Sequence, residues 1–219
     1  MENELSRLLL QIVVPELSRT LFMVSVSTLL ATLIGTLLAI ILIVTYKNGL
    51  QPNPYIYQFL DTIINIVRSF PFIILIVAII PFTRAIIGTS IGEKAALVPL
   101  TLAGAPFIAR IIESSLREVD KDLIEAAKSF GASKRQIIFK IMLPEALPSI
   151  ISGITLAVIA ILGCTAMAGA VGAGGLGAVA ITYGYANFDN TVMYGTVFVL
   201  IILVQLLQAA GNFFYKILK

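Results

Sequence analysis

Two long stretches of this sequence contain no charged residue, and they constrain the fold more than any other feature. No charge occurs between Arg19 and Lys47, and none occurs from Ala146 to Phe188. A run of about 20 apolar residues is enough for a helix to cross the hydrocarbon core of a bilayer. Over the whole chain only 12% of the residues are charged, whereas soluble domains have about 25%. We therefore expect an all-α polytopic membrane protein.

The breaks between apolar stretches divide the chain into five predicted transmembrane helices within one domain, 1–219. Turn-forming residues follow the first stretch, and a segment containing two glycines separates the second from the third. The uncharged stretch that ends at Phe188 is too long for one span and too short for two spans with a loop. A helix followed by a glycine-rich re-entrant or extracellular segment fits it better. The expected spans are 18–46, 56–83, 95–117, 146–168 and 190–215.

The segment 120–144, called the knuckle below, is predicted to form two short helices joined at an angle. Asp120 is a suitable N-cap for the first helix, and Gly131 stands where a glycine would end it. The tetrad Ser133–Gln136 has the spacing of a capping box, and the helix that it opens must stop near Pro144. The alternative is an ordinary solvated cytoplasmic loop.

The apolar side chains of the knuckle fall on one face of each predicted helix. These are Leu123, Ala127 and Phe130 in the first helix, and Ile137, Ile141 and Met142 in the second.

Basic residues are distributed unevenly between the two sides that five spans would create. If the knuckle is cytoplasmic, only four basic residues lie outside, and they are Arg7, Arg19, Arg84 and Lys94. The other eleven lie inside: Lys47, Arg68, Arg110, Arg117, Lys121, Lys128, Lys134, Arg135, Lys140, Lys216 and Lys219. The positive-inside rule then predicts an N-terminus outside and a C-terminus in the cytoplasm. The first residues lack a basic region and a cleavage site, so no removable signal peptide is expected.

Several function classes are excluded by composition. The chain has no histidine and one cysteine, Cys164, within an apolar run, so zinc sites, disulfides and Cys-His catalysis are excluded or nearly so. We expect no metal site, no catalytic residues and no cofactor in this chain. A net charge of +3 does not suggest binding to nucleic acid.

Two glycine patterns are weak matches to nucleotide-binding motifs. Gly172–Gly177 satisfies G-x-G-x-x-G, but a membrane span precedes it and no acidic residue follows at the required distance. Gly88–Lys94 has the wrong spacing for a P-loop. The glycines near Gly172 are better explained by close backbone approach or unwound main chain. Any nucleotide must therefore belong to a partner.

Two further patterns leave alternatives open. Small residues recur every four positions, which marks helix contacts either within one subunit or across a dimer. They are Ser149, Gly153 and Ala157, and then Ala160, Cys164 and Ala168. Arg110 and Glu113 are ionisable groups near the inner end of a span, and they could pair with each other or with a neighbour.

The knuckle carries a pattern that is specific to one family. It matches E-A-A-x3-G-x9-I-x-L-P of importer-type ABC permeases at Glu125, Ala126, Ala127, Gly131, Ile141, Leu143 and Pro144. From about Tyr55 to Tyr215 the chain resembles the permeases of bacterial methionine importers. That resemblance also rests on Arg68-Ser-Phe-Pro-Phe-Ile-Ile-Leu75, Pro81-Phe-Thr-Arg84, Gly88-Thr-Ser-Ile-Gly92, Ala105-Pro-Phe-Ile-Ala-Arg110, Leu143-Pro-Glu-Ala-Leu-Pro148 and Ala170-Val-Gly-Ala-Gly-Gly-Leu-Gly177.

The resemblance implies a homodimer in the bacterial plasma (inner) membrane, embedded in lipid. Two cytoplasmic ABC ATPases would bind ATP and Mg, and an extracytoplasmic substrate-binding lipoprotein would deliver methionine, D or L. Closure of the ATPases would move the knuckles through their coupling residues. The alternatives are import of another amino acid, an ATPase-independent secondary transporter or channel, and a membrane scaffold without transport.

An apolar substrate also needs a passage without fixed charge. Met167 is a candidate gate residue at the dimer axis, with ordinary helix packing as the alternative. The glycines after it would leave backbone groups free to meet substrate. The candidate path residues are Met167, Gly169, Gly172, Gly174, Gly175 and Ser69.

Overall fold

The computed structural model describes residues 13–219, so the expectation about a signal peptide lies outside the described residues. The helices are α2 (Val14–Thr45), α3 (Pro54–Ser69), α4 (Phe72–Ala78), α5 (Ile80–Ile87), α6 (Glu93–Arg117), α7 (Lys121–Ser129), α8 (Lys134–Gln136), α9 (Leu143–Ala168), α10 (Gly175–Ala178) and α11 (Asn190–Leu218). Three π-helical segments are η2 (Ile137–Met142), η3 (Gly169–Ala173) and η4 (Val179–Tyr185). No strand occurs in this range, and the expected all-α class is confirmed.

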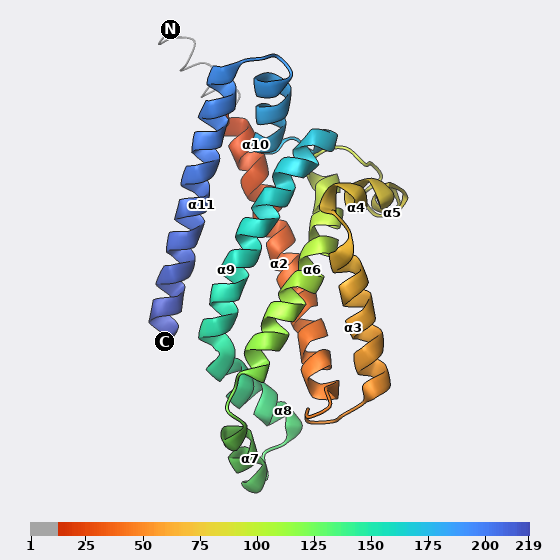
Figure 1. Ribbon diagram of the computed structural model, residues 1–219, viewed down its shortest axis with the longest axis vertical. Helices are drawn as coiled ribbons and strands as arrows, with labels where there is room; N and C mark the ends of the chain where they lie inside the picture. Colours follow the sequence, from red (N-terminus) through yellow and green to blue (C-terminus); the bar gives the residue numbers. More distant parts are fainter. Residues whose placement is uncertain (1–12) are drawn as a thin grey trace.

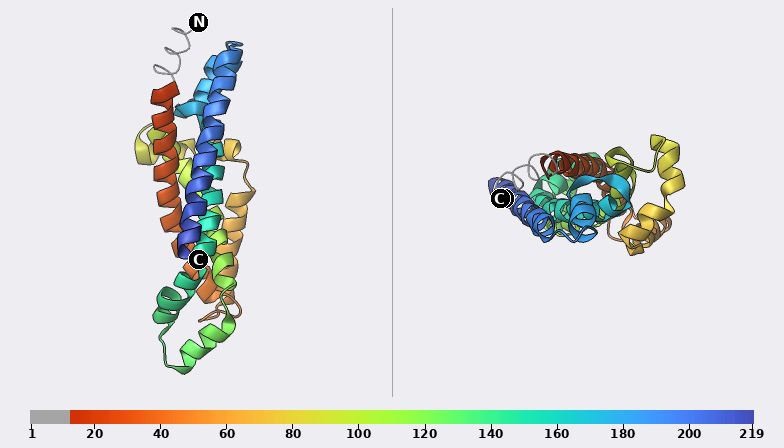
Figure 2. Two further views of the ribbon diagram at one scale, coloured as in Figure 1. Left: turned by 90° about the vertical axis from the view of Figure 1, so that its left-hand side faces the viewer. Right: turned by 90° about the horizontal axis from the view of Figure 1, so that it is seen from above.

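The long helices run roughly side by side, and the knuckle projects beyond them at one end (Figures 1 and 2). Within the described residues, four helices are long and apolar enough to cross a membrane, and α3 with α4 forms a fifth, bent candidate. α2 packs along α6 because small residues let the two backbones approach. A Cβ added at Gly35 would lie 2.9 Å from the carbonyl oxygen of Ala105.

The expected second span, 56–83, is not one continuous helix. The chain bends by 103° between α3 and α4. Phe70 has extended backbone angles (φ −74°, ψ 127°) at the break, because the ring of Pro71 disfavours the helical conformation in the residue before it. α4 and α5 consequently lie crosswise beside the end of α6 that is distant from the knuckle, on one side of the bundle (Figures 1 and 2).

The prediction that the second knuckle helix stops near Pro144 was wrong. Helical turns continue from Lys134 through Pro144 into α9, which ends at Ala168. The π-helical segment η2 lies directly before the proline. A wider turn at that point relieves the clash between the proline ring and the carbonyl four residues earlier, so the helix continues.

The glycine-rich segment after α9 folds back on the bundle instead of forming another span. Gly172 and Gly174 have φ values of +96° and +80°, which only glycine adopts without strain. A Cβ at Gly169 would lie 2.5 Å from the backbone nitrogen of Ala178. The interpretation of these glycines as points of close backbone approach is confirmed.

Candidate functional site

The knuckle is organised by local capping, as its sequence predicted. The Asp120 carboxylate accepts a hydrogen bond from the backbone N–H of Asp122 (2.9 Å). Gly131 has a φ of +77°, and the N–H of Ala132 donates to the carbonyl of Ala127 at 3.0 Å, which completes a glycine C-cap. The capping box of Ser133–Gln136 is present with both reciprocal bonds. These three predictions are confirmed.

The apolar residues of the knuckle divide into a packed set and an exposed set. The packed set consists of Ile124, Ala127, Ile137, Ile138 and Met142, which contact the core between the long helices. Leu123 is 41% exposed and Phe130 is 92% exposed, so the predicted face with Ala127 is only partly buried. Glu125, Ala126, Leu123 and Phe130 form an outward surface, called the tip surface below.

The seven pattern residues of the knuckle follow the same division. Glu125, Ala126, Gly131 and Pro144 are exposed, whereas Ala127, Ile141 and Leu143 are partly buried. The first group is available to a partner, and the second supports the knuckle against the bundle.

A cluster of charged residues joins three helices beside the knuckle. Glu113 of α6 is buried (2% exposed). Its carboxylate accepts hydrogen bonds from Arg110 Nη1 (2.8 Å) and Arg117 Nη2 (2.5 Å). Arg110 also pairs with Asp61 of α3. Arg117 lies 3.8 Å from the ring centroid of Tyr46, at the end of α2, a cation–π contact. Both alternatives for Arg110 and Glu113 therefore hold, because they pair with each other and with neighbours.

Only part of this cluster is marked by the sequence. Arg110, Glu113 and Arg117 are spaced by three and four residues, which places them on one helix face. That spacing is a usable signal for the ion pairs within α6. The partner Asp61 and the aromatic contact come from other helices, and nothing local marks them.

The glycine-rich turn is held by side chains of α2. The N–H of Gly175 donates to Glu16 Oε2 at 2.5 Å, and the N–H of Leu176 donates to Thr20 Oγ1 at 2.8 Å. Arg19 pairs with Glu16 (2.6 Å) and reaches Glu93 of α6 (3.4 Å). These two backbone N–H groups are therefore occupied, contrary to the expectation that the glycines leave them free for substrate.

The remaining path candidates are spread over one end of the bundle. Met167 is 48% exposed on α9. Ser69 is exposed, and its hydroxyl donates to the carbonyl of Asn65 at 2.7 Å, so it is bonded within α3. Gly169 is buried at the end of α9, and Gly172 and Gly174 form the turn.

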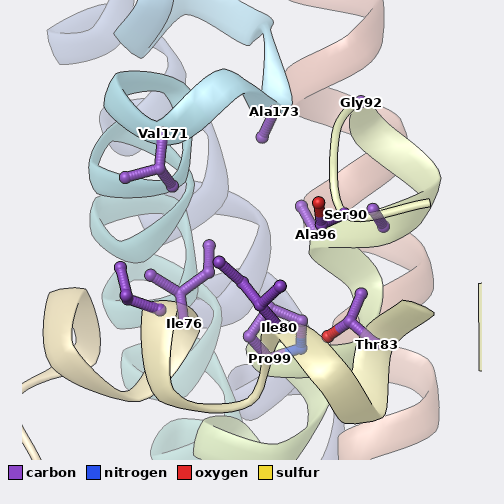
Figure 3. A pocket seen from close by; sticks show the side chains of 11 residues that line it. Ile76, Ile80, Thr83, Ser90, Gly92, Ala96, Pro99, Val171 and Ala173 are labelled. Carbon is purple, nitrogen blue, oxygen red and sulfur yellow. The ribbon is translucent and has the colours of Figure 1, made fainter. Parts of the chain in front are cut away.

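A cavity at this end is lined mainly by apolar side chains of α4, α5, α6 and η3 (Figure 3). Val171 and Ala173 face Ile76 and Ile80 across it, and Thr83 contributes a hydroxyl. Its volume of about 30 Å³ suits about two water molecules and is far below the roughly 300 Å³ of ligand pockets. Within residues 13–219, no group of three side chains is arranged to hold a metal ion.

One of the two small-residue stripes packs within the subunit. Ser149 and Ser115 of α6 share a hydrogen bond of 3.0 Å. Gly153 lies against Ile111 of α6, and Ala157 is fully buried. In the second stripe Ala160 is exposed and Cys164 is partly buried.

Known transport proteins resemble this chain over most of its length. Residues 31–219 match the family described as the binding-protein-dependent transport system inner membrane component. The probable D-methionine transport system permease protein MetI of Vibrio cholerae is 48% identical over 194 residues, which cover 89% of this chain and 86% of that protein. The methionine import system permease protein MetP of Bacillus subtilis is 46% identical over 179 residues, covering 81% and 80%.

Solved structures agree with these relatives. An inward-facing structure of the MetNI methionine ABC transporter matches with a TM-score of 0.94 and 44% identity, covering 96% of this chain and 98% of that chain. Since the family match extends over most of the sequence, the chain belongs to the inner membrane components of binding-protein-dependent transport systems.

Proposed function

We propose that this chain is the membrane-spanning permease subunit of an ATP-driven ABC importer that moves methionine, D or L, into the cytoplasm. The observation that carries the proposal is similarity to methionine permeases along nearly the whole chain, at 48% sequence identity in one relative and a TM-score of 0.94 in one solved structure. As a member of this family it is a multi-pass inner membrane protein.

The tip surface supports a cytoplasmic ATPase as the partner. An exposed aromatic side chain surrounded by smaller apolar ones is typical of a protein contact, and Phe130 is 92% exposed at the end of the knuckle. Two copies of this chain would each contact one ATPase, which binds ATP and Mg. This chain itself would carry out no chemistry.

The distribution of basic residues supports a cytoplasmic knuckle and an N-terminus outside. The binding lipoprotein would then meet the opposite end of the bundle, where α4, α5 and the glycine-rich turn lie. Methionine would pass between the two copies near Met167, with Gly169, Gly172, Gly174 and Ser69 along the path.

The decisive test is uptake by the assembled complex in liposomes. This chain is produced with its ATPase and binding lipoprotein, and uptake of D- and L-methionine is compared with a panel of other amino acids, with and without ATP. We expect ATP-dependent uptake of both methionine enantiomers. Uptake without ATP would indicate a secondary transporter, uptake of another amino acid alone would change the substrate, and no uptake at all would leave a scaffold.

A further inference from the structure

A second cavity lies between the knuckle and the turn that joins α2 to α3, and the proposed function leaves it without a role. Its volume is about 210 Å³. The apolar part of its lining comes from α2, α6, α7 and the segments beside them: Ile43, Leu50, Leu116, Val119, Ile124 and Met142. The charged part consists of Arg117, Lys121 and Lys128, and within residues 13–219 no acidic residue lines the cavity.

The two lysines reach this cavity because of their spacing on α7. Lys121, Ile124 and Lys128 follow one another at three and four residues and share one face of the helix. All three line the cavity, whereas the tip-surface residues do not. Arg117 already pairs with Glu113. Neither lysine forms an ion pair with any residue between positions 13 and 219.

The position of the cavity along the bundle follows from the helix that it adjoins. It lies at the end of α2, where an apolar helix of 32 residues gives way to a polar turn, so it is placed at the boundary between membrane and water. Lys134 Nζ donates to Gln51 Oε1 at 2.9 Å, which links the knuckle to the turn beside the cavity. Basic pockets at the cytoplasmic membrane boundary favour the head groups of anionic lipids.

We infer that this cavity binds the phosphate group of an anionic phospholipid, with the lysines on the phosphate and the glycerol end of the acyl chains on the apolar wall. The assignment to the inner leaflet rests on the proposed orientation. A free phosphate ion has the same charge, but it would leave the apolar wall uncovered. A bound lipid would join α7 to the α2–α3 turn and hold the knuckle in place, while the tip surface stays available to the ATPase.

Native mass spectrometry of the full chain in mild detergent tests this inference directly. The probes are phosphatidylglycerol, phosphatidylcholine and inorganic phosphate. The variant K121Q/K128Q removes the two cavity charges, and R135Q/K140Q is the matched control, because it removes two exposed knuckle charges that do not line the cavity. Each lysine is expected to contribute the binding free energy of one cation near an anionic lipid. Because K121Q/K128Q loses both contributions, it should bind phosphatidylglycerol about 30-fold more weakly than the wild type.

The expected pattern is preferential binding of phosphatidylglycerol over phosphatidylcholine in the wild type and in R135Q/K140Q, and loss of that preference in K121Q/K128Q. Equal losses in both variants, or none in K121Q/K128Q, would overturn the inference. Inorganic phosphate that binds as tightly as phosphatidylglycerol would identify a free anion as the ligand. If the double variant fails to fold, K128Q alone should weaken binding about fivefold. Because lipid binding is measured without transport, failure here is distinct from failure of methionine uptake.

Discussion

Replacing Glu113 by alanine should destabilise this protein more than any other single loss of a carboxylate in α6. The carboxylate is buried and accepts hydrogen bonds from Arg110, Arg117 and the hydroxyl of Tyr57 (3.3 Å). Its removal leaves two guanidinium groups without their shared counter-charge. Both arginines lie in the part of α6 that packs against α2 and α3, so the loss affects the contact among three helices.

The magnitude follows from what each arginine retains. Breaking a buried ion pair by removing one partner costs about 3–5 kcal/mol. Arg110 keeps its pair with Asp61 and Arg117 keeps its contact with Tyr46, so we expect the lower end, about 3 kcal/mol. For a chain of this length each kcal/mol lowers Tm by about 2–4 °C, which gives a decrease of about 6–12 °C.

Cys164 provides the assay. It is the single cysteine of the chain and is partly buried against the core, so a thiol-reactive fluorescent dye reports its exposure on heating in detergent. Glu118→Ala is the matched control, because Glu118 is exposed at the end of the same helix. If the Tm of Glu113→Ala falls by no more than that of Glu118→Ala, the cluster does not stabilise the contact among α2, α3 and α6, and the reasoning fails.

Three further predictions test the knuckle, the orientation and the gate. Gly131→Val should abolish substrate-stimulated ATP hydrolysis in an assembled complex, because a β-branched residue resists a φ of +77°. The control Gly131→Asn should retain most of that hydrolysis. Normal substrate-stimulated hydrolysis in the valine variant would refute a role of Gly131 in coupling to the ATPase. In a background without Cys164, the cysteine of Ser133→Cys should react with membrane-impermeant thiol reagents only from the cytoplasm. The cysteine of Thr89→Cys should react only from outside. The reverse pattern would overturn the proposed orientation. The cysteine of Met167→Cys should cross-link to its copy in the dimer in at least one nucleotide state. Met167→Ala should raise the amount of ATP hydrolysed per substrate molecule moved. Absence of any cross-link would place the gate elsewhere.

The features that the sequence predicted correctly are those determined by neighbouring residues. A cap at Asp120, a left-handed glycine at Gly131 and the capping box of Ser133–Gln136 each depend on bonds that span a few residues. Their geometry is fixed by side-chain chemistry at short range. Tertiary contacts changed none of them.

The features that it missed depend on residues distant in the chain or on a choice between two local outcomes. The bond from the N–H of Gly175 to Glu16 joins positions 159 apart, and no periodicity marks such a pair. Pro71 and Pro144 illustrate the second case. A proline can end a helix or continue it after a wider turn, and here the chain bends at Pro71 but continues through Pro144. Packing against neighbouring helices decides between these outcomes.

The helical turns that continue from Lys134 to Ala168 connect the knuckle to the start of the glycine-rich turn as two ends of one lever. A helix of this length extends about 50 Å, so a tilt of about 5° at one end displaces the other by about 4 Å, close to the pitch of one helical turn. A small rotation at the knuckle is therefore amplified into a sideways step large enough to exchange side-chain contacts at the far end. By the same geometry, a side-chain contact that resists movement at the far end also limits how far the knuckle can rotate.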